Sequence, residues 1–212
     1  MQRIPIPFSA VALAIAAATV TVPARSASGD LPSSCIGCSF SERDLHGADL
    51  SGVNYVGANF RNANLRGARA SGAELVGANF RGADATDADF TDAKLVGVNF
   101  EGATLTRARF GSSSLVGANF SSTHAQGLQM ARADLIGVSF RGAALRDANL
   151  RDSKICTRDS RGHIDCADFS NADVSGVDLR GALICGDNDA CSPVDAATLR
   201  ERSHSPLNGA RL

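Results

Sequence analysis

Large apolar residues recur at every fifth position along most of this chain, and small or polar residues fill the positions between them. From Phe40 to Ile155 every fifth residue is large and apolar except at Ala70, Ala85 and Ala125. The residue two places earlier is usually Ala, and the residue two places later is often Gly. A period of five fits neither the ~3.6 residues of a helical turn nor the two-residue alternation of a strand. The pattern therefore predicts a chain that turns a corner every five residues, with a large side chain pointing inward on each side.

A second period sets the number of sides. The hexapeptide Leu-Val-Gly-Ala-Asn-Phe at 75–80 recurs with small changes at 95–100, 115–120 and 135–140, which is a repeat of 20 residues. Four pentapeptides then form one square coil, and coils stacked at about 4.8 Å place every twentieth residue in one column. The sequence predicts an aromatic core column made of Phe40, Phe60, Phe80, Phe100, Phe120 and Phe140.

The unit reads Ala-(Asn/Asp)-(Leu/Phe)-x-Gly, and over residues 36–184 it resembles the pentapeptide-repeat family. The resemblance implies an all-β fold, a right-handed quadrilateral parallel β-helix, and the handedness comes from the resemblance alone. We expect about seven coils and a short C-terminal helix. The register fails after Ile155, because the next centred apolar residue, Phe169, follows by 14 positions. Residues 156–166 are therefore expected to leave the coil as a loop.

The two ends of the chain differ from the repeat. Residues 1–24 combine Arg3, an apolar run over 10–20 and a small-residue site at Val22-Pro23-Ala24, which predicts a signal peptide cleaved after Ala24. The run is shorter than the ~20 residues that span a bilayer, so a retained anchor is the weaker alternative. We expect a periplasmic or secreted protein with no membrane contact beyond the signal peptide. Residues 25–35, rich in Ser, are interpreted as a flexible leader.

The tail over 185–212 is interpreted as a loop followed by a cap. Ser192 is placed as the N-cap of a short helix, with Pro193 at its first position and Asp195 in its first turn. A solenoid exposes strand edges and apolar core at its ends, so this helix is expected to cover the last coil.

Cysteines lie only at the ends and the interruption of the repeat: Cys35, Cys38, Cys156, Cys166, Cys185 and Cys191. In an exported protein this placement predicts disulfides. The last four bracket two short loops, which favours the pairs Cys156–Cys166 and Cys185–Cys191. The Cys35-Ile-Gly-Cys38 segment is interpreted as a structural disulfide or as pairing with another terminal cysteine. Its alternative is a thiol-redox pair or half of a metal site.

Charge and candidate chemistry exclude several function classes. The formal net charge is -1, too small to attract nucleic acid or a membrane surface. Family members that mimic DNA need an acidic face, whereas here Arg61, Arg81 and Arg141 share a column with Glu101. The interior is filled by Phe, Leu and Ala, which leaves no cavity for a catalytic site. We expect no nucleic-acid partner, no cofactor, no metal and no enzymatic activity.

Outward positions form further columns. Asp49, Arg69, Asp89 and Arg109 are expected to make an alternating-charge ladder, and Asn59, Asn79, Asn99 and Asn119 an amide ladder. One outward column is apolar, with a length of about 24 Å at one strand spacing per coil: Ile36, Val56, Val76, Val96, Val116 and Ile136. It is either an interface or a by-product of duplication and of the preference of strands for β-branched residues.

The leading hypothesis is a non-enzymatic exported scaffold or protein–protein interaction module. Its rigid β-helix would present the apolar column to an unknown protein partner or to a second copy. The alternative is a small binding or thiol-redox module that acts through Cys35 and Cys38.

Overall fold

The computed structural model describes residues 31–186, 190–195, 197–198, 207 and 210–211. The expected signal peptide, residues 25–30 of the expected leader and most of the tail lie outside these residues. Within the described part of the chain, no helix has the length and apolar character that crossing a bilayer requires.

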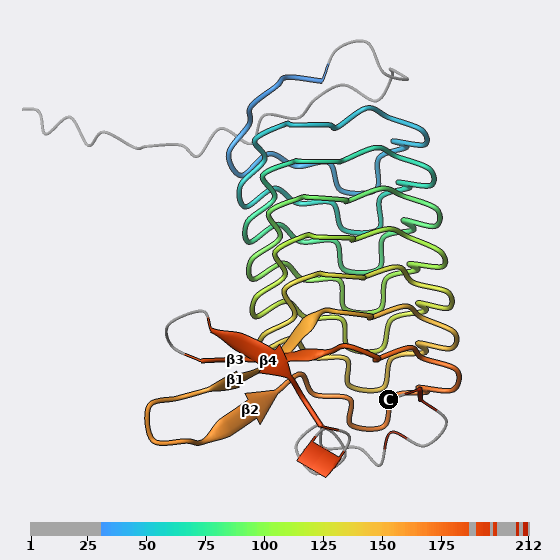
Figure 1. The fold of residues 1–212 in the computed structure, drawn as a ribbon. Coiled ribbons are helices and arrows are strands. Elements are labelled where there is room, and N and C mark those ends of the chain that lie inside the picture. The colour runs from blue at the N-terminus through green and yellow to red at the C-terminus, as the bar shows by residue number, and fades with distance from the viewer. Residues whose placement is uncertain (1–30, 187–189, 196, 199–206, 208–209, 212) are drawn as a thin grey trace, which may run out of the picture.

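The chain winds into a stack of coils, in which each coil lies directly on the next (Figure 1). Parallel bridges join residues 20 positions apart, from Ser34↔Asn54 through Asp134↔Lys154. Backbone hydrogen bonds follow the same rule, as when the N–H of Phe60 donates to the carbonyl of Asn79 at 2.7 Å. The 20-residue period of the sequence is therefore the length of one turn of an all-β solenoid.

Each corner is a tight turn with one residue in the left-handed backbone region. The N–H of Ala78 donates to the carbonyl of Leu75 at 3.0 Å, and between them Gly77 has φ of 65°. Arg107 and Arg132 occupy the same turn position with φ of 56° and 60°. This conformation costs a residue other than Gly roughly 1–2 kcal/mol, which explains why Gly recurs there.

Phenylalanine rings stack along the core. Adjacent rings in the expected column have centroids between 4.6 Å, for Phe60 and Phe80, and 5.4 Å, for Phe120 and Phe140. Phe169 extends the column at 5.1 Å from Phe140, although it follows by 29 positions instead of 20. The inserted residues therefore leave the coil and return to it without breaking the core.

The first coil begins earlier than the sequence pattern indicates. Ser34 already bridges to Asn54, and the N–H of Cys35 donates to the carbonyl of Asn54 at 2.8 Å. The Tyr55 hydroxyl donates to the carbonyl of Pro32. The boundary expected at residue 36 is thus too late, because strand pairing needs only a backbone partner and tolerates the loss of the side-chain repeat.

Four strands form a sheet that projects from one side of the stack near its C-terminal end (Figure 1). They are β1 (Lys154–Arg158), β2 (Ile164–Cys166), β3 (Leu183–Gly186) and β4 (Cys191–Pro193). The pairs β1/β2 and β3/β4 are antiparallel hairpins, and β1 lies parallel to β3, which gives the order β2-β1-β3-β4. The segment expected as a loop at 156–166 is therefore largely a hairpin. We call these four strands the hairpin sheet.

A disulfide joins the two strands of each hairpin. Cys156 and Cys166 are register partners with Cα atoms 3.9 Å apart, and Cys185 and Cys191 are register partners at 4.1 Å. These are the pairs favoured by the sequence. The third disulfide joins Cys35 to Cys38.

The helix expected to start at Ser192 does not start there. Ser192 and Pro193 belong to β4, because pairing with β3 and the Cys185–Cys191 disulfide extend the chain there. The Asp195 carboxylate instead accepts the N–H of Thr198 at 2.8 Å, and residues 197–198 have helical backbone. The remainder of the expected helix lies outside the described residues.

Described tail residues cover the last coil. Leu207 is buried in the core, and the N–H of Arg211 donates to the carbonyl of Val177 at 2.7 Å. The carbonyl of Arg211 in turn accepts the N–H of Leu179 at 2.8 Å. The open edge of the solenoid is therefore partly paired by its own C-terminus.

The core column predicts a large effect of one truncation. Phe100 stacks on Phe80 and Phe120 at 4.7 and 5.0 Å, so Phe100→Ala leaves a cavity and should cost about 3–5 kcal/mol of unfolding free energy. Chemical denaturation followed by circular dichroism measures it. Thr106→Ala, on the surface of the same coil, should change stability by less than about 0.5 kcal/mol. Equal effects of the two variants would contradict the stacked core.

Candidate interaction surface

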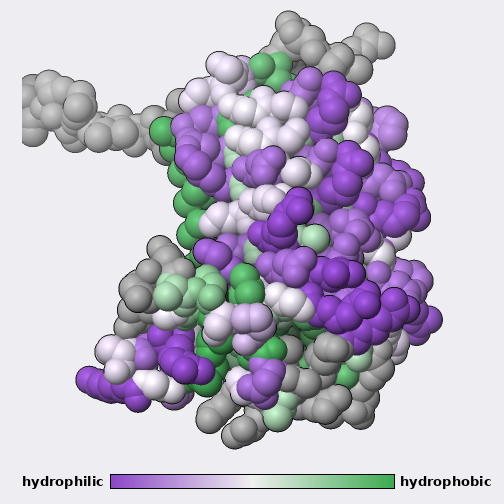
Figure 2. Space-filling model, viewed as in Figure 1, coloured by the Kyte–Doolittle hydropathy of each residue, from purple (hydrophilic) through white to green (hydrophobic). Residues whose placement is uncertain are grey.

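The six apolar residues singled out from the sequence lie in one row along a single corner of the solenoid. Each follows a centred core residue and begins the next turn, and we call the row the apolar stripe: Ile36, Val56, Val76, Val96, Val116 and Ile136. Ile36 is 79% exposed and Val96 38%, while the other four are half-buried because stacked neighbours shield one another. Hydrophobic side chains line the left edge of the stack above the hairpin sheet, while the surface toward the viewer is largely polar (Figure 2).

Backbone hydrogen bonds hold this corner in place. The N–H of Gly57 donates to the carbonyl of Val76 at 2.8 Å, and the N–H of Gly77 donates to that of Val96 at 2.9 Å. The same bond recurs at every step from Gly37 to Ile136. Because these polar groups are satisfied within the solenoid, the corner can offer its apolar side chains without exposing unpaired backbone.

A column of glycines runs beside the stripe, and the sequence pattern alone did not mark it as part of a surface. It consists of Gly37, Gly57, Gly77, Gly97, Gly117 and Gly137, with φ between 64° and 68°. A Cβ atom added at Gly57, Gly77 or Gly97 would meet nothing within 4 Å. On the other corners this turn position also accepts Asn62 and Arg107. The backbone therefore does not by itself require Gly at all six steps.

The third column across this side of the solenoid consists of amides and hydroxyls: Ser39, Asn59, Asn79, Asn99, Asn119 and Ser139. The Oδ1 atom of Asn79 accepts the N–H of Arg81 at 3.1 Å, and that of Asn99 accepts the N–H of Glu101 at 2.9 Å. These side chains thus cap their own turns and do not form the expected amide-to-amide ladder. Among the described residues, their NH2 groups have no protein partner.

The stripe, the glycine column and the amide column together form one side of the solenoid, which we call the flat face. This side carries no charged residue in any of the six coils between its first pentapeptide, 36–40, and its last, 136–140. The stripe-equivalent position on other corners is often charged, as at Arg61, Arg66 and Arg151. All of these positions have the same place in the turn. The preference of strands for β-branched residues therefore does not explain why one corner alone is apolar.

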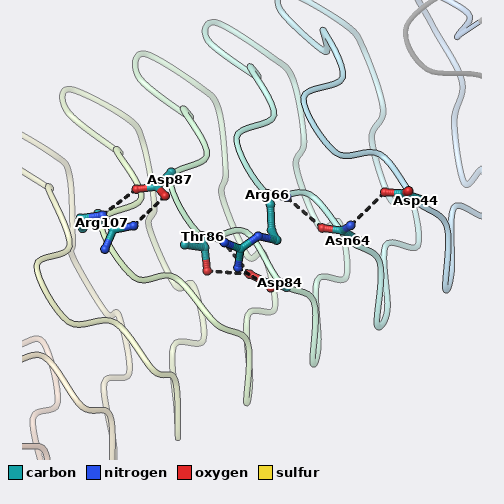
Figure 3. A network of polar contacts seen from close by, with 7 residues as sticks. All are labelled: Asp44, Asn64, Arg66, Asp84, Thr86, Asp87 and Arg107. Carbon is teal, nitrogen blue, oxygen red and sulfur yellow. Dashed lines mark hydrogen bonds and ion pairs between the residues drawn. The ribbon is translucent and has the colours of Figure 1, made fainter.

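The other sides are polar and internally paired. Asn64 Nδ2 donates to Asp44 Oδ1 at 2.9 Å, one coil apart. Contacts of the same kind follow along this side (Figure 3), namely Arg66–Asp84 at 3.2 Å and Arg107–Asp87 at 2.7 Å. Exposed pairs of this type contribute only about 0–1 kcal/mol each. They do engage most of the surface charge within the protein itself.

The expected charge ladder exists as two separate ion pairs. Arg69 pairs with Asp49 at 2.9 Å, and Arg109 pairs with Asp89 at 2.7 Å. Both pairs join neighbouring coils and favour the correct stacking register. They lie on a different side of the solenoid from the flat face.

Hydrogen bonds to guanidinium groups hold several carboxylates in their charged form. The hydrogen bonds that the Arg69 guanidinium and Ser51 donate to the Asp49 carboxylate lower its pKa to about 2. The Arg180 guanidinium lowers the pKa of Asp178 to about 2 in the same way. These carboxylates act as structural acceptors throughout the physiological range.

All three disulfides lie at the corner of the stripe, at its two ends. Cys35 directly precedes Ile36, and Cys38 begins the first side of the flat face and is 3% exposed. At the other end, Cys156 follows Ile136 by 20 positions and Cys185 follows Cys156 by 29, and both are buried, in β1 and β3. The disulfides, predicted separately from the apolar residues, therefore lie at the two ends of the stripe.

The hairpin sheet begins where the stripe ends. β1 includes Lys154 and Ile155 of the last complete side and continues through Cys156 without turning, so the hairpins project past the flat face. The hairpin tip is ordered by the Asp159 carboxylate, whose Oδ1 accepts the N–H groups of Arg161 and His163 at 2.9 Å. The flat face is thus bordered at its C-terminal end by a projecting, disulfide-joined sheet.

Within residues 31–186 and the described parts of the tail, no three His, Cys, Asp or Glu side chains group closely enough to hold a metal ion.

Comparison with known proteins agrees with the geometry. The chain matches pentapeptide repeats, in eight copies, over residues 44–82, 73–111, 83–120 and 113–152. No curated protein matches its sequence. Full-length QnrB1, a plasmid-mediated fluoroquinolone resistance protein, is similar in structure with a TM-score of 0.65 and 23% identity, over 84% of this chain and 81% of that one. A trypsin-treated form of QnrB1 is similar with a TM-score of 0.56 and 25% identity, over 73% and 80% of the two chains.

The lowered carboxylate pKa values predict a loss of stability in acid. A carboxyl group whose folded pKa lies below its unfolded value of about 3.9 stabilises the fold above that value and ceases to do so as pH falls through the folded pKa. The urea midpoint should therefore be constant from pH 7 to about pH 4 and fall between about pH 4 and 2. In Asp49→Asn this fall should be smaller. An identical acid profile in the variant would contradict the assignment.

Proposed function

The chain belongs to the pentapeptide-repeat family, whose fold is a right-handed β-helix, and on that premise we propose that it is a non-enzymatic, exported scaffold that binds a protein through its flat face. One observation carries the proposal: a rigid side with an apolar stripe and no charge stands among sides that carry charged residues, several of them in ion pairs between coils. Interfaces differ from ordinary surface in this depletion of charge at their centre.

Rigidity supports the same proposal. Every step of the stripe is fixed by a hydrogen bond between coils, so binding orders little of the protein and loses little entropy. The disulfides at both ends of the stripe restrict the parts that the repeat holds least well. A surface of this kind suits recognition of a partner with a matching flat or grooved side.

Export is proposed from the sequence. The apolar segment before Ala24 and six cysteines, all paired in disulfides, are typical of a protein that matures in an oxidising compartment. The likeness to QnrB1 supports the fold, and no resistance function is proposed for this chain.

The stripe predicts where a substitution abolishes binding. Val76→Lys with Val96→Lys places two charges in its centre and should reduce affinity capture of a partner, or self-association, by about tenfold or more. Circular dichroism should be unchanged, because both side chains point away from the core. Pull-down from periplasmic extract and sedimentation measure the two forms of binding.

A matched pair on another corner serves as control. Thr106→Lys with Gln126→Lys places the same charges at the same turn position in successive coils, away from the flat face. This variant should bind as the native protein does. If both double variants bind equally well, the flat face is not the contact surface.

The scaffold role also predicts that Cys35 and Cys38 are structural. Cys38 is almost fully buried, so their disulfide should resist mild reductant in the native protein, with no thiol detected by titration until denaturant is added. Rapid and reversible reduction of this pair in the folded protein would instead support the thiol-redox alternative.

A further inference from the structure

We propose that the flat face binds the flat face of a second copy of this chain, with the two solenoids antiparallel. This inference rests on the proposed function and names its partner. The resulting assembly is a two-fold dimer with the two hairpin sheets at opposite ends.

Spacing is the first argument. The three columns of the flat face repeat at one strand spacing, about 4.8 Å, over six coils. A partner with a different rise would match one or two steps and then fall out of register. A second copy has the same rise along its whole length and matches all six.

The order of the columns sets the orientation. A two-fold axis perpendicular to the solenoid axis brings stripe onto stripe, glycine column onto glycine column, and amide column onto amide column. A parallel pair would place the stripe against the amides. In the antiparallel pair with full overlap, Val76 meets the partner's Val96, and Asn59 lies opposite the partner's Asn119.

Charge and shape favour the same contact. The flat face carries no charged residue, so two copies meet without like-charge repulsion in any step. Space above Gly57, Gly77 and Gly97 is open, and glycine columns facing each other let two sheets approach to the usual ~10 Å. The free NH2 groups of the asparagine side chains then have amide acceptors within reach on the other copy.

Area limits the strength of the contact. The face is about 24 Å long and one side of a coil wide, which is below the ~800 Å² per partner of a standard stable interface. The projecting hairpin sheets add contact area at each end. We therefore expect a dimer with a dissociation constant in the micromolar range or weaker.

A glycine variant tests the face without disturbing the core. Gly97→Arg puts a long charged side chain into the open column, and the backbone tolerates it because Arg107 and Arg132 occupy the same turn position. Gly72→Arg is the matched control, since Gly72 has φ of 66°, open space around it and a place on another corner. The two substitutions should lower the unfolding free energy by the same amount.

Sedimentation equilibrium over a wide concentration range gives the readout. The native protein and Gly72→Arg should dimerise with dissociation constants within about twofold of each other, and Gly97→Arg should dimerise about tenfold more weakly or not at all. A native protein that stays monomeric at millimolar concentration, or a Gly97→Arg variant that dimerises normally, overturns the proposal.

Cross-linking tests the orientation. Mixing Asn59→Cys with Asn119→Cys should give a linked dimer with a bismaleimide of about 10 Å reach, because the two positions oppose each other across sheets ~10 Å apart. Either variant alone places its two cysteines about three steps, ~14 Å, out of register and should not link. Efficient linking within one variant, without linking in the mixture, overturns the antiparallel arrangement.

The two proposals fail differently. If the native protein is monomeric while Val76→Lys with Val96→Lys still loses a partner in pull-down, the scaffold function stands and self-pairing falls. If that double variant leaves both dimerisation and partner capture intact, both proposals fall.

Discussion

The hydrogen bond between coils is the constraint on which this structure depends. Because backbone hydrogen bonds join each coil to the next, as when the N–H of Phe60 donates to the carbonyl of Asn79, every residue type chosen once per 20 positions becomes a column. A column of Phe fills the core, and a column of Val forms a stripe. The residue types on the surface are therefore set separately for each side of the solenoid.

This geometry separates stability from recognition. The core residues and the turn closures are alike on all four sides, and they hold the coils together whatever the outward residues are. Outward positions are then free to differ, and three sides carry ion pairs while one carries Val, Gly and Asn. The disulfides and the hairpin sheet lie at the corner of that one side, which links the least repetitive parts of the chain to its least polar surface.

Much of the fold could be predicted from the sequence, because a strict repeat turns spacing into position. The core column and the stripe follow from the 20-residue period, and the two hairpin disulfides follow from cysteines that bracket short insertions. The hairpin sheet could not be predicted, because β1 and β3 pair at separations of 29 and then 28 residues, a register set by the insertion and by an irregularity after Lys154. The helix start at Ser192 was wrong because local capping preference lost to pairing with β3. The role of Asn79 as a turn cap was missed, since the sequence does not show which N–H group donates to the side-chain oxygen of each asparagine.

The central claim is that the flat face is the contact surface, and its side-chain amides report on it directly. NMR signals of the NH2 groups of Asn79 and Asn99 should shift as the protein is concentrated or a partner is added. Those of Asn64 and Asn149, which bond within the polar sides, should remain in place. Shifts confined to Asn64 and Asn149, with Asn79 and Asn99 unaffected, would contradict the account.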